Sequence, residues 1–574
     1  MTFKLADNII SPLGFTTEAN YQSLKEGRSG LQRYEKLWNL PEPVVASLLN
    51  RELVEAHFAP LSDGKDYTFF EKIAILSAST ALAQTSIDAA STRVIFILST
   101  TKGNVHLLAE PKKNYEEQPS PLLGCTAKRI AQYFNNPNEP IVVSNACTSG
   151  VCAQIEAMRL LEQGQYDYAV VIGADIQSPF IVSGFQSFKA LSDEPCRPFD
   201  ASRKGLNLGE AAATIVYTTQ NSSDACWQAV RGAIRNDANH ISGPSRTGEG
   251  SFLALQSVLG ATKAEDLAVV SLHGTATNYN DEMESIALSR AGLSQVPVSG
   301  LKGYYGHTMG AAGILETILT MTALDQGCLL GTRGYESQGT SCPLNISAAD
   351  RTTNRTAFVK LLSGFGGCNA ALYFEKKGKS QETQASNASV QPTLPAPQAT
   401  LTLTPTGLTI NGIDQPTTAT GHQLLTELYS HHIGDYPKFY KMDPLSRLGF
   451  VASELLLASI TPRPQDPNTS VIFMGRAGSL ANDNKYQATI QDPENFFPSP
   501  ALFVYTLPNI VTGEIAIRNH FYGETNYLLL DHYDESVMRQ CIQAAIADTT
   551  TLLTGWVDCT DEEHFEADLQ FYSL

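Results

Sequence analysis

The chain has 574 residues, of which 43% are hydrophobic and 17% charged, a balance typical of globular proteins. It is too long for one hydrophobic core, so we expect two or three domains. The net charge of −18 and the pI near 5.1 exclude a general binder of nucleic acids or anionic membranes. Residues 1–15 predict neither a signal peptide nor a membrane span. The ten scattered cysteines favour a reducing cytoplasm.

The most informative segment is IVVSNACTSG at residues 141–150. Its first three residues predict a buried strand, the next seven an elbow of small residues, and residues 151–161 a helix. At such an elbow, free N–H groups and the positive end of the helix dipole favour a thiolate over a thiol. Cys147 is therefore a candidate nucleophile, although free cysteines are more often small buried hydrophobes.

Two histidine motifs and a glycine-rich turn follow. They are HGTAT at residues 273–277, KGYYGHT at 302–308, and SGFGGCNA at 363–370. Small residues beside His273 and His307 let the backbone approach a ligand closely. Each motif alone also fits a structural histidine or an ordinary turn. The order of all three after Cys147 is what indicates a shared site.

In this order the chain resembles the decarboxylating β-ketoacyl synthases of fatty-acid and type II polyketide assembly. The resemblance covers essentially residues 1–375 and also includes ISPLG at 10–14, KEGRSG at 25–30 and RPFD at 197–200. It implies a thiolase-like five-layer αβαβα fold, made of two similar halves that meet near residue 220. Independently, apolar strands alternating with helices predict an α/β protein with buried sheets.

The resemblance also implies a role for each matching residue. Cys147 would carry the acyl chain as a thioester, while His273 and His307 would bind the malonyl thioester and promote its decarboxylation. The N–H groups of Cys147 and Phe365 would form an oxyanion hole, and Phe365 would also act as a gate. Lys302 would complete the catalytic set. Glu316, together with Lys302, would fix the orientation of the histidines. Thr275 and Thr277 would be the remaining supporting residues.

No cofactor and no metal are expected, because the sequence has no CxxC, HExxH, GxGxxG or P-loop motif. Thioester exchange needs a soft nucleophile, which cysteine supplies. Two histidines with one cysteine argue against thiolases, which pair two cysteines with a histidine, and against initiating synthases, which pair a histidine with an asparagine. Asn145 and Cys368 stand where threonine is common in the family. These departures leave the substrate and subfamily open.

The implied partners are acyl- and malonyl-loaded acyl carrier proteins. Carrier proteins are acidic, so docking on this acidic chain requires a local basic patch. Arg203 and Lys204 are candidates, although a solvated charged loop is the more common role of such residues.

A second unit follows residues 376–400, whose Gln, Ser, Thr and Pro predict a flexible linker. Residues 401–574 repeat the order of the first half. The helix predicted at 447–457 corresponds to that at 72–82, and the strand at 471–475 to that at 94–98. The helix at 537–545 corresponds to the helix after Cys147, and the strand at 550–556 to that at 168–173. The copy has His532, Tyr533 and Asp534 at its elbow instead of a cysteine, and it ends before any histidine motif.

This second unit resembles a truncated chain-length factor, the non-catalytic partner of ketosynthases in aromatic polyketide and aryl-polyene pathways. We expect it to bury an uncovered apolar face against residues 1–375, in a pseudo-dimer within one chain. It would then cap the acyl tunnel and set product length. The candidate wall residues are Phe496, Phe497, Leu502, Phe503, Val504 and Tyr505. The alternatives are a fatty-acid elongation synthase with an unusual extension, or a non-catalytic scaffold that binds carrier proteins.

Overall fold

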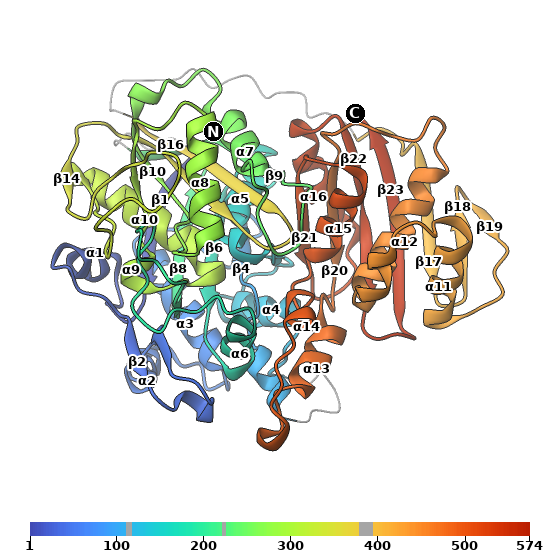
Figure 1. Cartoon of the computed structure of the whole chain (residues 1–574), viewed down its shortest axis with the longest axis horizontal. Helices are drawn as coiled ribbons and strands as arrows, with labels where there is room; N and C mark the ends of the chain where they lie inside the picture. Colours follow the sequence, from blue (N-terminus) through green and yellow to red (C-terminus); the bar gives the residue numbers. More distant parts are fainter. Residues whose placement is uncertain (111–117, 221–225, 378–393) are drawn as a thin grey trace.

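The computed structural model describes residues 1–110, 118–220, 226–377 and 394–574. Two bodies lie side by side, the first built from residues up to 377 and the second from residues 394–574 (Figure 1). The predicted linker lies mostly outside the described residues. Its two ends do not, because strand β16 (Cys368–Lys377) and strand β17 (Ala399–Thr404) include them. The linker is therefore shorter than the predicted 376–400.

The first sheet holds the strand that leads into the elbow. Its order is β1 (Thr2–Ile10), β8 (Ala211–Thr218), β6 (Tyr168–Asp175), β4 (Val94–Ser99) and β5 (Ile141–Val143). Strands β6, β4 and β5 run parallel, whereas β8 is antiparallel to both β6 and β1. The central strands are apolar throughout because helices cover both faces.

The second sheet carries the two histidine motifs. Its order is β9 (Cys226–Asn236), β16, β15 (Ala357–Ser363), β10 (Leu267–Ser271), β11 (Pro297–Ser299) and the short β13 (Asn345–Ile346). The two sheets meet where Thr2 and Phe3 pair with Ala229 and Gln228.

Helices complete the layers. Helix α3 (Phe69–Leu82) covers the outer face of the first sheet, and α7 (Glu249–Leu259) covers that of the second. Helices α5 (Ser149–Glu162) and α10 (Ala312–Asp325) lie between the sheets. All residues of α5 except the last are buried, as expected of a helix that is covered on every side. The predicted five-layer αβαβα fold is confirmed.

Other helices surround these layers. They are α1 (Thr17–Lys25), α2 (Arg51–Phe58), α4 (Leu123–Tyr133), α6 (Pro179–Ser187), α8 (Asn278–Arg290) and α9 (Lys302–Tyr305). Among the described residues, no helix combines the length and the apolar character that crossing a membrane requires.

The second body repeats the topology of the first sheet. Its strand order is β17, β23 (Phe565–Ser573), β22 (Thr551–Cys559), β20 (Ser470–Gly475) and β21 (Thr525–Leu529). Each pairing has the same direction as its counterpart in the order β1, β8, β6, β4, β5. The predicted duplication of the first half is confirmed, and we call this second body the half-domain.

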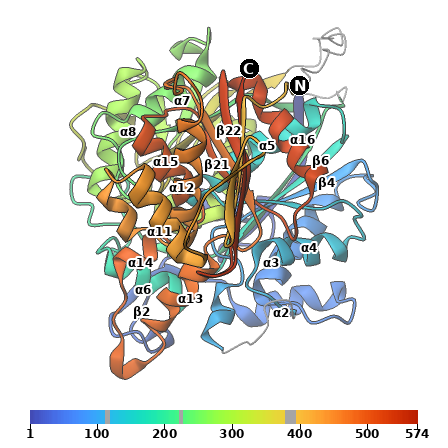
Figure 2. The same cartoon turned by 90° about the vertical axis from the view of Figure 1, so that its right-hand side faces the viewer.

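Helices cover the half-domain sheet unequally. Figure 2 shows α11 (Gly421–His432), α12 (Pro444–Ala458) and α15 (Ile510–Asn519) on one face, and α16 (Glu535–Ala545) on the other. Helix α16 occupies the place of α5 in the first half. Two further helices, α13 (Leu480–Ala488) and α14 (Pro500–Val504), extend towards α6 of the first body.

The half-domain docks on the first body through its edge strand. Strand β21 runs antiparallel to β5, with Leu528 opposite Val143 and Leu529 opposite Val142. Helix α16 packs against α5, and the two sheets become continuous. At the same junction Arg159 makes a bidentate ion pair with Glu524 at 3.0 and 2.7 Å, with both side chains buried. The pseudo-dimer within one chain is therefore built directly behind the elbow.

Near the junction the half-domain buries an apolar face against the first body, as expected, because Ile472, Leu528 and Trp556 share one core with residues of α5. Farther from the junction, the sheet instead exposes polar residues. In β17, Leu401 and Leu403 are buried in the core with α12, while Thr402 between them is exposed. In β23, buried Ala567 and Leu569 alternate with more exposed polar residues. Alternation of this kind lets one face of a sheet meet water. The half-domain thus tolerates the loss of the layers that cover the corresponding face of the first body.

Candidate active site

Cys147 lies at the predicted elbow, in a 3₁₀ turn (Ala146–Thr148) between β5 and α5. Ala146 has a φ of 50°, a left-handed conformation that is costly for a residue with a side chain and is found at sharp functional turns. Ser149 fixes the turn, because its Oγ accepts from the N–H of Asn145 at 2.8 Å and donates to the carbonyl of Ala146 at 2.6 Å. The predicted strand, elbow and helix are all present.

The structure brings Cys147, His273 and His307 together from three distant segments. One side-chain ligand atom of each lies within 4.8 Å of the other two. The imidazole ring centroids are 5.1 Å apart and the rings are nearly perpendicular, at 82°. Both histidines are buried, with 3% and 1% of their surface exposed. A ligand carbonyl placed among them could contact the thiol and both rings.

Both imidazoles are neutral at pH 7. Burial lowers the pKa of His273 and of His307 well below the ordinary value of 6.5, and the nearby Lys302 and Lys360 lower it further. The Nδ1 of His307 accepts a hydrogen bond from the N–H of Met309 at 3.2 Å, so its proton is on Nε2. That Nε2 is buried and has no partner among the described residues. It is therefore available to donate to a bound oxygen.

A buried Lys–Glu–Lys cluster lies beneath the histidines. Glu316 pairs with Lys302 at 2.8 Å and with Lys360 at 2.5 Å. Lys302 also donates to the carbonyl of His273 at 2.6 Å, and Lys360 donates to that of Leu272 at 3.1 Å. Burial alone would raise the pKa of Glu316, but its two lysine partners hold it below its usual value. Two cations and one anion leave a net positive charge under the site.

Lys360 was missed by the sequence prediction. The signal for it was a single lysine inside the apolar strand 357–362, since a buried lysine is costly unless it is paired. Glu284 is a second supporting residue. It accepts from the N–H groups of His273 at 2.6 Å and Gly274 at 2.8 Å, and burial raises its pKa to about 7. These contacts hold the His273 loop in place.

The surroundings of Cys147 favour its thiol form, which is opposite to the expected thiolate. Burial raises its pKa to about 12, and the opposing effect of Lys302 is too small to compensate. Helix-terminus effects favour the anion, but removing a thiolate from water costs more.

The glycine-rich turn packs directly against the elbow. A Cβ placed on Gly364 would lie 3.2 Å from the N of Cys147 and 3.3 Å from the Cβ of Ala146. The next residue is Phe365, whose ring centroid is 5.6 Å from that of Phe188. The turn that carries Phe365 therefore lies against the backbone at Cys147.

Thr275 and Thr277 follow His273 and form a hydroxyl pair. Their Oγ1 atoms are 2.9 Å apart, and Thr277 is the residue immediately before helix α8. The two departures from the family pattern also touch each other. Asn145 Nδ2 donates to Cys368 Sγ and to the carbonyl of Thr525 in the half-domain, both at 3.0 Å. The hydrogen bonds of Asn145 therefore tie the elbow both to Cys368 and to the half-domain.

Within the part of the chain that the structure describes, two groups of side chains have the spacing of metal ligands. One is the Cys147, His273 and His307 trio. The other is at the junction and consists of Glu139, Asp531 and His532. Lysine competes with a cation at both, because Lys302 and Lys360 lie beneath the trio and Lys128 Nζ is 2.7 Å from Asp531. The positive charge under the trio instead favours an anion such as a carboxylate or an enolate.

One predicted docking residue and one predicted tunnel residue are wrong. Arg203 is not a docking residue, because its side chain is only 6% exposed and donates to the carbonyls of Asp200 and Gly339. Its predicted neighbour Lys204 is exposed and pairs with Glu194 at 2.9 Å. Phe497 cannot line an acyl tunnel, since it is 80% exposed, whereas Phe503 is buried at the junction.

Solved structures share this architecture. The full chain superimposes on 78% of a structure described as the PfaC keto synthase–chain length factor, with a TM-score of 0.74 and 14% identity. A ketosynthase–chain length factor complex from Xenorhabdus doucetiae matches 66% of the chain and 98% of its own, with a TM-score of 0.54 and 23% identity. These likenesses define the class as a thiolase-like condensing-enzyme fold that extends through the half-domain.

Family comparisons are more specific. The models of the N-terminal and C-terminal domains of β-ketoacyl synthases match residues 6–222 and 228–336. The 3-oxoacyl-[acyl-carrier-protein] synthase 2 of Vibrio cholerae is 27% identical over 403 residues, which are 64% of this chain and 97% of that protein. The tetracenomycin ketoacyl synthase alpha subunit of Streptomyces glaucescens is 33% identical over 249 residues, 40% of this chain and 58% of that one.

The chain belongs to the β-ketoacyl synthase family. It is an acyltransferase that extends an acyl chain by decarboxylative Claisen condensation with a malonyl unit.

Proposed function

We propose that Cys147, His273 and His307 perform the condensation, within a ketosynthase body formed by residues 1–377. The observation that carries this proposal is the convergence of one thiol and two neutral imidazoles above a net positive buried cluster. A scaffold that only bound carrier proteins would gain nothing from two buried lysines, whose desolvation is costly.

The first step is acyl loading. The Cys147 thiol attacks the thioester carbon of an acyl carrier protein, the carrier's C–S bond breaks, and the thiol proton ends on the departing carrier thiol. The negative oxygen of the tetrahedral intermediate would be held by the N–H groups of Cys147 and Phe365. One such donor is worth roughly 3–4 kcal/mol in acyl-transfer sites.

The second step uses the histidines. The malonyl thioester oxygen accepts from His307 Nε2–H and from His273, carbon dioxide leaves, and the electron pair forms an enolate stabilised by these donors. The enolate carbon attacks the acyl carbon on Cys147, and the C–S bond breaks to release the β-ketoacyl carrier protein. Cys147 leaves as a thiolate and takes up one proton from solvent, which its high pKa favours.

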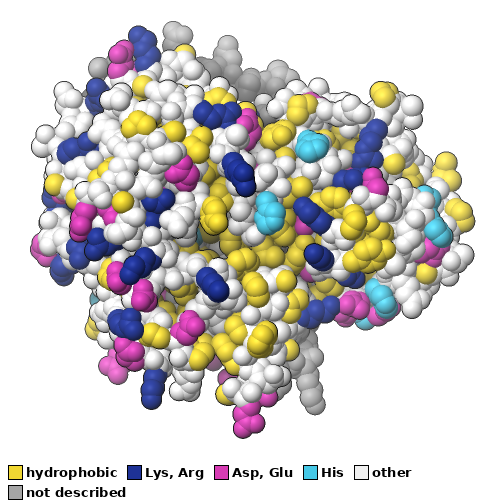
Figure 3. Space-filling model, in the orientation of Figure 1, with side chains coloured by type: hydrophobic (Ala, Val, Ile, Leu, Met, Phe, Trp, Pro, Cys, Tyr) yellow, Lys and Arg dark blue, Asp and Glu magenta, His cyan; other side chains and the backbone are white. Residues whose placement is uncertain are grey.

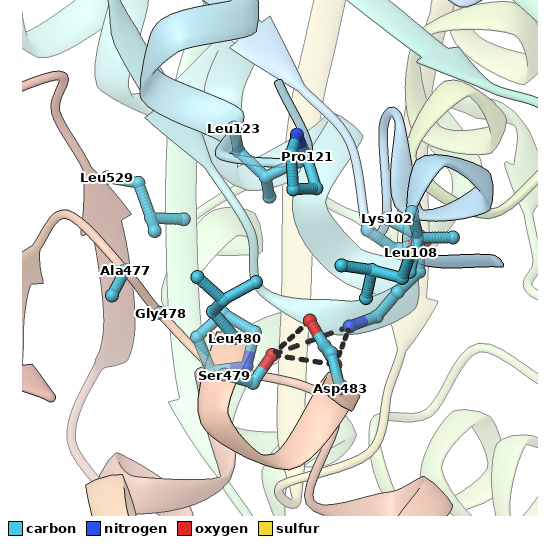
Figure 4. Close-up of a pocket in the computed structure, with 13 residues that line it drawn as sticks. Lys102, Leu108, Pro121, Leu123, Ala477, Gly478, Ser479, Leu480, Asp483 and Leu529 are labelled. Carbon is cyan, nitrogen blue, oxygen red and sulfur yellow. Dashed lines mark hydrogen bonds and ion pairs between the residues drawn. The ribbon is translucent and has the colours of Figure 1, made fainter. Parts of the chain in front are cut away.

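We propose that the half-domain, residues 394–574, closes the acyl tunnel. A small cavity of about 20 Å³ at the junction, with room for about one water molecule, is lined by residues of both bodies, including Leu108, Leu123, Leu480 and Leu529 (Figure 4). Lys102 of the first body crosses the same pocket to Asp483 of α13 at 2.8 Å. An enclosure built by both bodies would let the half-domain limit the length of the chain.

Phe503 is the residue that we propose as the end wall. It lies on α14 against α6, where a Cβ added to Gly184 would come within 2.2 Å of the Phe503 ring. The rings of Phe185 and Tyr486 lie 5.5 and 5.3 Å from it. Such a tightly packed aromatic side chain from the half-domain would stop an acyl chain that reached it.

The partners that we propose are acyl- and malonyl-loaded carrier proteins in fatty-acid-like or polyketide elongation. The relatives' names support this range, and one similar structure is described as an acyl-carrier protein in complex with its ketosynthase. Figure 3 shows hydrophobic side chains bordered by Lys, Arg and His over the middle of one face, near α6, α14 and α15. This is a suitable surface for an acidic carrier. The ten free cysteines agree with a cytoplasmic location.

The test is to trap the acyl-enzyme. Incubation with an acyl carrier protein, followed by peptide mass mapping, should place the acyl group on Cys147. The Cys147→Ala variant should keep its melting temperature but neither load nor condense. Cys152→Ala is the matched control, because Cys152 lies one turn and a half further along and is buried. An acyl group on Cys152, Cys368 or Cys541 would contradict the proposal.

A further inference from the structure

The half-domain reaches the catalytic turn with one side chain. Asn509, just before helix α15, donates from Nδ2 to the carbonyl of Phe365 at 2.8 Å. The asparagine is 1% exposed, so this hydrogen bond is shielded from water. Asn509 thus supports, from another body of the fold, the residue whose N–H is proposed to stabilise the oxyanion.

The turn is shaped to accept this contact. Gly366 has a φ of +87°, and a Cβ there would lie 2.6 Å from Asn509 Nδ2. On the other side, a Cβ on Gly513 of α15 would lie 2.5 Å from the carbonyl oxygen of Gly366. That oxygen also accepts from Asn236 Nδ2 at 2.8 Å, and the same nitrogen contacts Thr525 Oγ1 at 2.9 Å. Two consecutive carbonyls of the turn are therefore fixed at the junction.

We infer that Asn509 is a positioning residue for condensation, which orients the Phe365 backbone so that its N–H faces the carbonyl bound to Cys147. This inference rests on the proposed function. It makes the half-domain part of the catalytic arrangement, in addition to any effect on chain length. Preorganised donors act only when they are held where the charge develops, and Phe365 lies in a glycine-rich turn that has little rigidity of its own.

The inference predicts a selective defect. An oxyanion forms at the Cys147 carbonyl during loading and again during enolate attack, whereas decarboxylation takes place at the histidines. Loss of the Asn509 contact should therefore slow loading and attack but spare carbon dioxide release. An enolate that forms but attacks slowly is instead protonated, and it leaves as an acetyl carrier protein.

The experiment uses the full chain and the Asn509→Ala variant. Single-turnover loading is followed by mass spectrometry, and the acyl-loaded enzyme is then given malonyl carrier protein. We expect loading to fall about 10- to 100-fold, less than the loss of a whole oxyanion donor. The ratio of acetyl to β-ketoacyl product should rise by a similar factor. Carbon dioxide release should change by less than about threefold, a separation that general loss of structure would not produce.

Two further variants separate positioning from stability. Gly513→Ala pushes a methyl group against the Gly366 backbone, which must then shift, so it should reproduce the product ratio even though the clash also lowers the melting temperature. Asn482→Ala is the matched control, because Asn482 is equally buried and donates to the carbonyl of Leu502 at 2.7 Å inside the half-domain. It should leave the product ratio unchanged.

Two outcomes would overturn the inference. One is wild-type loading and product ratio in both Asn509→Ala and Gly513→Ala. The other is an equal loss of carbon dioxide release and condensation. A wild-type enzyme that fails to load at all would instead overturn the proposed function on which the inference rests.

Discussion

Glu156 should make the junction sensitive to pH. It lies on α5 opposite α16, is 2% exposed, and has Cys541 of α16 beside it. Burial raises its pKa from 4.5 to about 7, because the attraction of Arg159 does not offset the loss of hydration and the repulsion of Glu524. Glu156→Gln keeps the shape of the side chain but cannot ionise, so it isolates this one titration.

The sign follows from proton binding. Between pH 4.5 and 7 the folded chain keeps the Glu156 proton while the unfolded chain loses it, so the free energy of unfolding falls as pH rises. The contribution of Glu156 to the free energy of unfolding is fully present below pH 4.5 and is lost above pH 7. A difference of 2.5 pKa units, from 4.5 to about 7, at 1.36 kcal/mol each gives about 3 kcal/mol. Glu156→Gln should therefore match wild type near pH 4.5 and exceed it by about 3 kcal/mol at pH 8.

The assay is the melting temperature of both proteins across this pH range. At about 2.1 cal/mol/K per residue, unfolding of 574 residues has an entropy of about 1.2 kcal/mol/K, so the expected gain at pH 8 is roughly 2–3 °C. Glu162→Gln is the control on the same helix, because the Glu162 side chain is half exposed. A difference between wild type and Glu156→Gln that does not vary with pH would refute the reasoning.

Three other predictions follow from the site and the junction. Lys360→Met removes a buried positive charge, so the pKa of His273 should rise and decarboxylation should fail at a higher pH on acidification; an unchanged pH–rate profile would contradict this. Phe503→Ala should lower stability by about 3–5 kcal/mol and lengthen the products seen by mass spectrometry, whereas a destabilised variant with the same products would exclude Phe503 as the end wall. Residues 1–377 expressed alone should aggregate or dimerise, because the edge of β5 is uncovered; a well-behaved monomer by light scattering, with unchanged products, would show that the half-domain is dispensable.

Local patterns revealed the parts of the site that local chemistry determines. The elbow and both histidine motifs are short runs of small residues around a reactive side chain, and each was placed correctly from sequence. Lys360 was not found, because its partner Glu316 lies 44 residues away and only the fold brings the two together. The direction of the Cys147 pKa shift was not predicted for the same reason, since burial depends on the whole fold and not on the elbow alone.

The duplicated topology was visible because the order of helices and strands repeats, even where individual residues do not. The polar face of the half-domain was also present in the sequence, as ATLTLT at 399–404 and FEADLQFYS at 565–573, each with the two-residue period of a half-solvated strand. It was overlooked because the complete fold has no such exposed face. What sequence could not supply was the Asn509 contact, which joins residues 144 positions apart.

Half a thiolase unit is sufficient here for a physical reason. The half-domain touches the ketosynthase site through α15, β21 and the segment around Asn509. Helix α13 closes the pocket at the junction. Each of these elements either corresponds to an element of the first half or is an insertion between such elements. A complete second unit would add a second sheet and outer helices. These would cover the face of the half-domain sheet that Thr402 and its neighbours now expose to water. Polar residues on that face remove the need for the missing layers, and the contacts between the half-domain and the site are kept. The half-domain can therefore lose the missing layers and still hold the Phe365 turn.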